Sequence, residues 1–309
     1  MDSKLIAEGL VAVESALTNA VDSDVEALHD ASHHIISSGG KRIRPQVALL
    51  AYLAAGGDDL ETAVPMAAAL EMVHTATLVH DDINDHSLTR RGQVTVHAKW
   101  GRTFALLTGD YLFTKVYELM APYGTPYNAI MSDACIRLVE GETLQASAAK
   151  VGTMDAETYK TIISRKTASL FEAGAEMGAR LAGADDAIVE MFIAYAHNLG
   201  LTFQIVDDIL DIVGDPETMG KDVGLDLAQH RGVMAARDDD GSAAPITTTE
   251  SEDVQEMISQ LRDSGAVEIA RMQAAEVARR ARVALEPVTD SPAKQALLAL
   301  VDLVMDRDK

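Results

Sequence analysis

The stretch DAIVEMFIAYAHNLGLTFQIVDDILD, residues 186–211, lies inside a long segment between Pro126 and Pro216 that contains no proline. Apolar residues recur through this segment with helical period, and Ala, Leu, Met and Glu are common in it. No convincing run alternates β-branched and polar residues, although Ile205-Val206 and residues 93–96 are short stretches that could also form strands. The pattern predicts an all-α fold.

The composition excludes several classes of protein. Hydrophobic residues make up 48% of the 309 residues, which is too many for a disordered chain. The net charge of −22 predicts a surface that repels nucleic acid and anionic membranes, and 4% aromatic residues argue against a protein that stacks on bases. Abundant Asp with scarce Lys resembles the surface of a protein from a salt-loving organism.

The scarcity of cysteine and the lack of a signal peptide, a long apolar run or a shift in composition bear on compartment and domain organisation. Cys135 is the only cysteine, which excludes an intrachain disulfide and a metal site built from several cysteines. We find no signal-peptide pattern, and the longest clean apolar run, residues 47–55, is too short to cross a bilayer. These features predict a cytoplasmic protein without a transmembrane segment. Uniform composition predicts one domain over residues 1–309, with a polar surface loop at about 237–252.

Two acidic pentapeptides share the form DDxxD: residues 81–85 (DDIND) and residues 207–211 (DDILD). Each follows an apolar stretch, and on a helix the first and last Asp project from one face. Carboxylates gathered there repel one another and cost desolvation energy, which bound cations would offset. Hard oxygen ligands suit Mg²⁺, which also bridges to phosphate oxygens. One such motif could be a solvated acidic face, but two favour a metal site.

The scarce basic residues gather near these motifs. Nine of the 26 Lys and Arg do so: Lys41, Arg42, Arg44, Arg90, Arg91, Arg165, Lys166, Lys221 and Arg231. Their gathering in an acidic chain predicts a multiply charged anionic ligand, such as a diphosphate. The alternative is a set of intramolecular salt bridges. For Arg42 that alternative is favoured, because the spacing turns it away from Lys41 and Arg44.

With these residues in view, the chain resembles the trans-isoprenyl diphosphate synthases, also called polyprenyl synthetases. The resemblance is strong from about Ser37 to Arg231. The matching stretches are residues 39–45, 78–92, 109–112, 141–145, 166–168 and 203–208. The resemblance implies an all-α bundle around a deep central cavity, a homodimer, and head-to-tail condensation of isopentenyl diphosphate with an allylic diphosphate.

The resemblance also implies a role for each matching residue. Two or three Mg²⁺ ions would be held by six aspartates: Asp81, Asp82, Asp85, Asp207, Asp208 and Asp211. The allylic diphosphate would be contacted by Arg90, Lys166, Lys221 and Arg231. Isopentenyl diphosphate would be held by Lys41, Arg44, His74 and Arg91. Thr167 and Gln204 would turn their oxygens toward the allylic carbons.

Metal ions and cations of this kind neutralise a departing diphosphate, so that the allylic C–O bond ionises. His74 has a second interpretation, because a lone histidine on an apolar helix is usually a satisfied core residue. It precedes Asp81 by two helical turns, which puts it on the same face and favours a role in ligand binding.

Two features of the chain depart from the family or leave its product open. Arg231-Gly232-Val233 stands where the family usually has a Lys followed by Thr, which changes the donor geometry. The positions that form the floor against chain growth hold Ala76 and Thr77, both small. The resemblance therefore implies a geranylgeranyl (twenty-carbon) or longer product.

Two other interpretations compete with an elongating synthase. A terpene-cyclase-like enzyme also ionises a diphosphate, but it generally lacks the basic stretch at residues 39–45 and the pair Arg90-Arg91. A regulatory or weakly active synthase paralogue commonly loses one Asp cluster, whereas this chain keeps both. A di-metal redox bundle is disfavoured because Glu71 and His74 have the required spacing only once.

Overall fold

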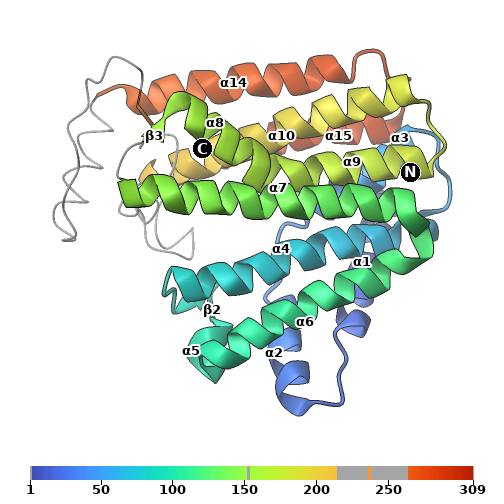
Figure 1. Ribbon diagram of the computed structural model, residues 1–309. Coiled ribbons are helices and arrows are strands. Elements are labelled where there is room, and N and C mark those ends of the chain that lie inside the picture. Colours follow the sequence, from blue (N-terminus) through green and yellow to red (C-terminus); the bar gives the residue numbers. More distant parts are fainter. Residues whose placement is uncertain (1, 152–153, 214–235, 238–263, 309) are drawn as a thin grey trace. The chain divides into compact units, whose positions relative to one another are not determined.

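The computed structural model describes residues 2–151, 154–213, 236–237 and 264–308, which are almost entirely helical (Figure 1). The longer helices are α1 (Asp2–Ala20), α2 (Glu26–Ser37), α3 (Ile43–Ala54), α4 (Val64–Asn84), α6 (Arg102–Met120), α7 (Gly124–Val151), α9 (Ser169–Leu181), α10 (Asp186–Val213), α14 (Ala266–Ala284) and α15 (Pro292–Met305). Shorter ones are α5 (Val96–Trp100), α8 (Ala156–Ile163) and the 3₁₀ segments η1 (Leu60–Thr62), η2 (Ala121–Tyr123) and η4 (Asp306–Asp308). The all-α prediction is confirmed.

Among the residues that the structure describes, strands are limited to two short pairs. β1 (Thr89–Arg90) pairs antiparallel with β2 (Gln93–Val94), and β3 (Met154–Asp155) pairs parallel with β4 (Ala236–Arg237). Of the two ambiguous stretches, residues 93–94 form a strand and Val96 begins α5, whereas Ile205-Val206 lies inside α10. The loop predicted at 237–252 begins in β4, and residues 238–252 lie outside the described residues.

The chain divides into two compact units, each built from separate stretches. The first unit comprises residues 1–132, 173–189 and 288–296. The second unit comprises residues 133–172, 190–287 and 297–309. The single domain expected from composition stays a prediction.

The first unit is organised around α4, which packs along α6 and also contacts α1 and α3. A proline stands in the first turn of α4, where its missing N–H costs nothing, and the residues that follow are mostly small and apolar. Met66, Leu70 and Met72 are completely buried. Residues 60–84 are long and apolar enough to span a membrane, but 72% of the apolar window is buried inside the protein, as in a core helix.

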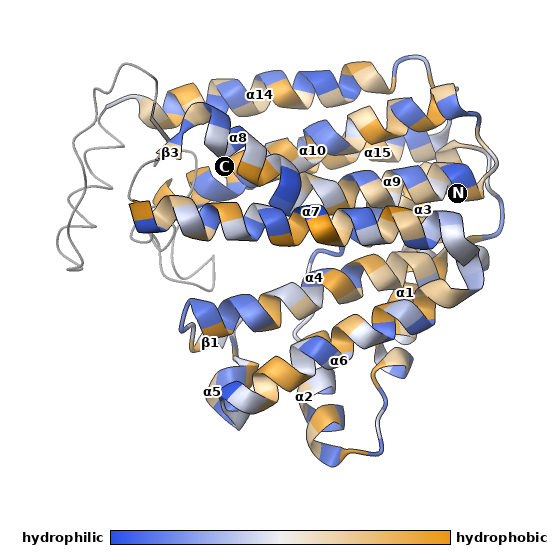
Figure 2. Ribbon diagram, viewed as in Figure 1, coloured by the Kyte–Doolittle hydropathy of each residue, from blue (hydrophilic) through white to orange (hydrophobic). Residues whose placement is uncertain are grey.

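The second unit packs α10 against α8 and α14. Ile205, Val206 and Ile209 of α10 share an apolar cluster with Ile162 of α8 and Ala270 of α14. In Figure 2, hydrophilic and hydrophobic residues alternate around α14, as expected for a helix with one buried face. This packing holds the end of α10, which carries the second DDxxD motif.

Candidate active site

The first DDxxD motif forms the last turn of α4, and Asp85 is the C-cap residue of that helix. Asp81 and Asp85 are half-buried, whereas Asp82 is buried. Arg90 Nε donates a hydrogen bond of 2.6 Å to Asp82 Oδ1. Burial raises the pKa of Asp82, and the neighbouring Arg90 charge only partly opposes that shift. The folded protein therefore holds the Asp82 charge at an energetic cost.

A two-residue hairpin sets the position of the two arginines after this motif. Arg91 (φ 52°) and Gly92 (φ 74°) both have positive φ between β1 and β2, as a type I′ turn requires. Arg90, on β1, reaches back to Asp82, and Arg91 Nη1 donates to the carbonyl oxygen of Gly39. The hairpin thus ties Arg90 to the acidic motif and Arg91 to the basic stretch at 39–45.

Gly40 makes this second connection possible. A Cβ atom at Gly40 would lie 2.8 Å from Arg91 Nη1 and 2.9 Å from Arg91 Cζ. Gly40 also has φ 148°, and Gly39 and Arg42 have positive φ as well. The backbone conformation therefore favours glycine at both positions, and a side chain at Gly40 would also displace the Arg91 guanidinium.

His74 sits among positive charges in the first unit. Burial lowers its pKa well below the usual value, and the charges of Arg44, Arg91, Arg90 and Arg42 lower it further. Burial likewise lowers the pKa of Arg91, with Arg42 and Arg90 adding to the effect. His74 is therefore neutral near pH 7. Three residues predicted to bind isopentenyl diphosphate, Arg44, His74 and Arg91, are brought together, while Lys41 is exposed nearby in sequence.

Arg42 is a structural residue, as its spacing indicated. Its guanidinium is buried and donates to Glu14 at 2.5 Å and to Glu71 at 2.8 Å. It also donates to the carbonyl oxygen of Ile36. The salt-bridge interpretation of Arg42 is confirmed. Glu71, which has the spacing from His74 that a di-metal redox site would need, is instead paired with Arg42.

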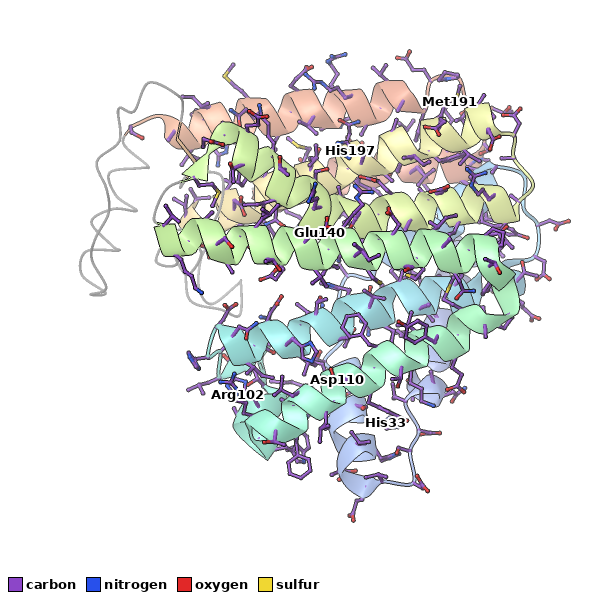
Figure 3. The ribbon with its side chains drawn as sticks, viewed as in Figure 1. His33, Arg102, Asp110, Glu140, Met191 and His197 are labelled. Atoms are coloured by element: carbon purple, nitrogen blue, oxygen red, sulfur yellow. The ribbon has the colours of Figure 1, made fainter. Side chains whose placement is uncertain are left out.

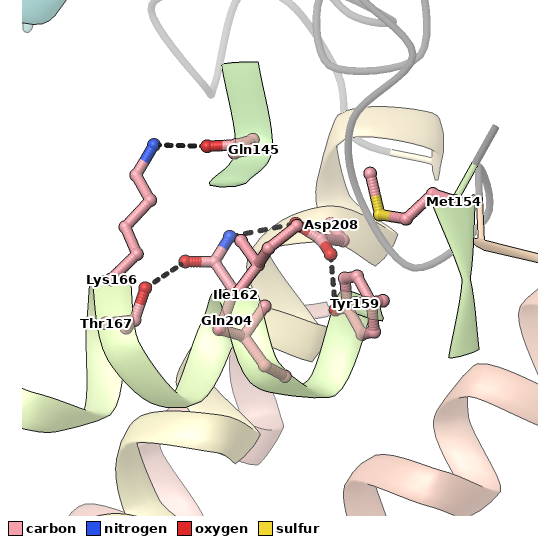
Figure 4. Close-up of a pocket in the computed structure, with 9 residues that line it drawn as sticks. Gln145, Met154, Tyr159, Ile162, Lys166, Thr167, Gln204 and Asp208 are labelled. Carbon is pink, nitrogen blue, oxygen red and sulfur yellow. Dashed lines mark hydrogen bonds between the residues drawn. The ribbon is translucent and has the colours of Figure 1, made fainter. Parts of the chain in front are cut away.

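The second DDxxD motif lies inside α10, where Asp208 and Asp211 are buried and Asp207 is half-buried. Asp208 accepts two neutral donors: Tyr159 donates to Oδ2 at 2.6 Å and Gln204 Nε2 donates to Oδ1 at 2.9 Å. Thr167 donates in turn to Gln204 Oε1 at 2.7 Å. Figure 4 shows this chain of hydrogen bonds along one side of a pocket.

Lys166 also lines that pocket, and two residues of α7 hold its side chain. Its Nζ donates to Glu142 Oε2 at 2.5 Å and to Gln145 Oε1 at 2.7 Å. The pocket is completed by Met154, Ile162 and Ile163, so its polar groups lie against an apolar wall. A pocket with the Lys166 cation, the Asp208 carboxylate, several neutral polar groups and an apolar wall suits a ligand that is polar at one end and apolar at the other.

Lys166 and Thr167 stand on a π-helical turn, residues 164–168 (η3), between α8 and α9. Such turns insert an extra residue into a helix and often occur at functional sites. Gly141 of α7 lies against this turn, because a Cβ there would be 2.5 Å from the Lys166 amide nitrogen. A Cβ at Gly200 of α10 would be 2.7 Å from Ala168 Cα. Two glycines therefore let neighbouring helices hold the turn closely.

Four features of the second unit were not predicted from the sequence: the π turn, Tyr159, the pair Glu142 and Gln145, and Arg307. Arg307 Nη2 donates to Asp207 Oδ1 at 2.6 Å, and its guanidinium lies 4.5 Å from the Phe203 ring centroid. Glu142 and Gln145, the two partners of Lys166, lie in the matching stretch at residues 141–145. Tyr159 and Arg307 lie outside every matching stretch.

The remaining predicted residues divide into two groups. Ala76 is completely buried in α4, and Thr77 is half-buried with its hydroxyl bonded to the carbonyl oxygen of His74. Lys221 and Arg231, together with the departure at residues 231–233, lie outside the described residues.

Both sets of carboxylates fit divalent metal ions. Their donors are carboxylate oxygens, the preferred ligands of hard cations. Asp82 Oδ2 is buried and has no hydrogen-bond partner within the described part of the chain. A buried acceptor in that state costs free energy that a cation would recover.

The chain matches known proteins along most of its length. The family model "Polyprenyl synthetase" matches residues 25–236. Octaprenyl diphosphate synthase of Escherichia coli is 33% identical, over 99% of this chain and 98% of that protein.

Solved structures agree with this match. Polyprenyl synthase from Caulobacter crescentus, complexed with calcium and isoprenyl diphosphate, has a TM-score of 0.91 and 33% identity over 99% of this chain and 97% of its own. Geranylgeranyl pyrophosphate synthetase from Pyrococcus horikoshii has a TM-score of 0.89 and 32% identity over 98% of each chain. The chain belongs to the polyprenyl synthetase family of trans-prenyl diphosphate synthases, and it is a prenyltransferase.

Proposed function

We propose that this enzyme condenses isopentenyl diphosphate head to tail with an allylic diphosphate, in a reaction that depends on Mg²⁺. The observation that carries the proposal is that Arg44, Arg91 and His74 lie close together, with Arg91 bonded to the backbone of Gly39 in the basic stretch. Guanidinium groups that lower the pKa of their neighbours repel one another, and a multiply charged anion relieves that repulsion. A cyclase has no second diphosphate to bind there.

We assign the two diphosphates to different residues. Lys41, Arg44, His74 and Arg91 bind isopentenyl diphosphate, with His74 donating as a neutral group. Arg90, Lys166, Lys221 and Arg231 bind the allylic diphosphate. Two or three Mg²⁺ ions, held by the six aspartates of the DDxxD motifs, supply the positive charge that makes the allylic diphosphate a better leaving group.

The polar oxygens of the pocket act on the apolar end of the allylic substrate. Thr167 and Gln204 orient their oxygens toward the allylic carbons, where positive charge develops as the C–O bond breaks. The apolar side chains beside them, including Ile162 and Ile163, exclude water that would otherwise capture that carbon as an alcohol.

Condensation and product sizing test the proposal directly. Purified protein is incubated at high salt with Mg²⁺, isopentenyl diphosphate and each allylic primer in turn. We expect elongated prenyl diphosphates and no hydrocarbon from the primer alone. A hydrocarbon or alcohol from the primer alone would identify a cyclase, and no condensation with any primer would identify an inactive paralogue.

A matched pair of arginine variants tests the observation that carries the proposal. Arg91→Gln removes one charge beside His74, and we expect KM for isopentenyl diphosphate to rise about tenfold or more while KM for the primer changes little. Arg102→Gln removes an exposed arginine at the start of α6 and should leave both constants unchanged. Equal behaviour of the two variants would contradict the assignment.

We propose a product of twenty carbons or more, because Ala76 and Thr77 leave the floor position small. Relatives with named products include both octaprenyl and geranylgeranyl synthases, so only the chain's own residues favour a length. Ala76→Phe should shorten the product, although Ala76 is fully buried and overpacking costs about 1–3 kcal/mol. Thr77→Phe, at a half-buried position, is the second variant, and an unchanged product ladder in both would refute the floor.

We propose that the enzyme acts as a cytoplasmic homodimer. Phe104 and Leu107, on one face of α6, are 46% and 51% exposed, and Tyr117 is 73% exposed on the same helix. Apolar side chains exposed together favour burial against another chain, and a second copy is the partner in this proposal. Sedimentation velocity should give twice the 33.0 kDa chain mass, and a monomer at micromolar concentration would contradict it.

A further inference from the structure

Two histidines and an aspartate, none of which is assigned a role in condensation, gather on the surface of the first unit. His29 and His33 lie one turn apart on α2, and Asp22 precedes that helix. Asp22 Oδ1 is 2.9 Å from His33 Nε2 and 3.7 Å from His29 Nδ1. The three ligand atoms all lie within 4.8 Å of one another, and Figure 3 labels His33 at this surface.

The fold holds these three residues together. Residues four apart on a helix project from the same face, so the spacing of His29 and His33 brings the two rings together, with centroids 4.2 Å apart and planes tilted by 44°. The Tyr111 hydroxyl of α6 donates to the backbone carbonyl of Asp22 at 2.8 Å. This bond fixes the backbone of Asp22 in the connection between α1 and α2, so that its carboxylate is presented to the histidines by a fixed segment.

The donor set distinguishes this cluster from the DDxxD motifs. Two imidazole nitrogens and one carboxylate oxygen suit borderline ions such as Zn²⁺, whereas Mg²⁺ prefers oxygen alone. Tetrahedral Zn²⁺ with bonds of about 2.0–2.1 Å needs ligand atoms roughly 3.4 Å apart. The two distances from Asp22 Oδ1, 2.9 and 3.7 Å, lie on either side of that separation. Both rings are half-buried, so an ion can enter and keep a water ligand.

We propose that Asp22, His29 and His33 form a Zn²⁺-type transition-metal site, with water as the fourth ligand. The bound ion crosslinks the α1–α2 connection to α2 and stabilises the first unit by mass action. It takes no part in condensation, because none of its ligands belongs to the residues assigned to either diphosphate.

His34 supplies a matched control on the same helix. It is the next residue after His33, but its Nε2 bonds to the carbonyl oxygen of Val94 and its ring packs edge-on against Trp100. Removing His34 therefore deletes a histidine of α2 without touching the cluster.

Titration calorimetry with zinc sulfate, in chloride-free buffer containing excess Mg²⁺, tests the proposal on the full-length protein. We expect one Zn²⁺ per chain in the wild type and in His34→Gln, and binding weaker by about tenfold or more in His29→Gln and in His33→Gln. The thermal midpoint should rise with Zn²⁺ only in the two proteins that bind it. Equal Zn²⁺ binding by all four proteins would overturn the site.

Bound Cu²⁺ provides a second readout that does not depend on folding stability. Electron paramagnetic resonance should show coupling to two nitrogens in the wild type and to one in His33→Gln, and coupling unchanged by the substitution would refute the assignment. Condensation with Mg²⁺ should be equal in wild type and His33→Gln. If the proposed condensation fails, the metal measurements still decide this site by themselves.

Discussion

The two DDxxD motifs have the same sequence form but different surroundings. In the first unit, the buried Asp82 is paired with a cation, Arg90, delivered by a hairpin. In the second unit, the buried Asp208 accepts hydrogen bonds from two neutral donors, Tyr159 and Gln204. The repeat therefore supplies the same carboxylates in both places, while the surrounding fold decides how each carboxylate is oriented and how its charge is compensated.

This difference separates charge compensation from positioning. Arg90 offsets part of the cost of a buried charge, and the raised pKa of Asp82, caused mainly by burial, means that the offset is incomplete. Tyr159 and Gln204 add no charge but fix both oxygens of Asp208. Substitutions at the two motifs should consequently separate activity, metal affinity and stability.

The largest effect is expected from removing the charge of either aspartate. Asp82→Asn and Asp208→Asn should each lower kcat on the order of a thousandfold, because each removes a ligand to the metal charge that stabilises the departing diphosphate. Because Asp82 has a raised pKa in the folded state, Asp82→Asn should not lower the free energy of unfolding at pH 7. Steady-state kinetics measure kcat, and urea unfolding measures the free energy of unfolding.

Asp133→Asn is the control for these two variants, since that carboxylate is 70% exposed on α7. A loss of more than about 1 kcal/mol of stability in Asp82→Asn would mean that its pair with Arg90 supports the fold, contrary to the comparison.

The next largest effect concerns the π turn beside the second motif. Gly141→Ala places a methyl 2.5 Å from the Lys166 backbone nitrogen, which has no flexible end to move aside. We expect the turn to shift, kcat to fall about a hundredfold and stability to fall by about 1–3 kcal/mol. Gly174→Ala is the control, because the closest atom its methyl would meet is the flexible end of Leu70, at 3.0 Å, while Ala48 Cβ at 3.5 Å and the Arg44 carbonyl oxygen at 3.8 Å are at ordinary contact distance.

The kinetic split distinguishes a displaced active site from general damage. Gly141→Ala should raise KM for the allylic substrate and leave KM for isopentenyl diphosphate unchanged, since the latter's proposed ligands lie in the first unit. If both constants rise together, or if the control loses as much activity, the glycine does not position Lys166 and Thr167.

The helical fold was predictable from local patterns, but the contacts that hold the candidate site residues were not. The helical period of the apolar residues and the absence of proline correctly indicated helices. The spacing of Arg42 from Lys41 and Arg44 correctly indicated that Arg42 forms a salt bridge. The π turn leaves no signal, because one extra residue in a helix does not disturb a pattern already broken by Arg165 and Lys166. Tyr159 meets Asp208 only through tertiary packing, 49 residues apart, which no local pattern encodes.

A smaller effect is expected from Tyr159→Phe, which removes one neutral donor from Asp208. The carboxylate keeps Gln204, so its charge is unchanged while its orientation loosens. Loss of a residue that orients a metal ligand typically weakens metal binding by about tenfold, and we expect the Mg²⁺ concentration for half-maximal activity to rise by that factor. Calorimetry with Mg²⁺ in the absence of substrates measures the same shift without catalysis.

Tyr117→Phe is the control for this variant, because Tyr117 is 73% exposed. A Tyr159→Phe enzyme with wild-type Mg²⁺ affinity and lower stability would show that the hydroxyl supports packing only.

The smallest effect concerns pH and the first unit. His74 has a folded pKa well below its usual value, because of burial and the surrounding arginines, whereas the unfolded chain takes up a proton near pH 6.5. The unfolded state therefore binds more protons as pH falls below about 6.5, so folding should lose stability there, by at most about 1.4 kcal/mol per pH unit for this one group. His74→Gln removes that proton, and urea unfolding between pH 7 and 5 should give a shallower decline than in the wild type. If His74→Gln declines equally steeply, the pKa of His74 is not lowered in the folded protein by burial and the neighbouring arginines.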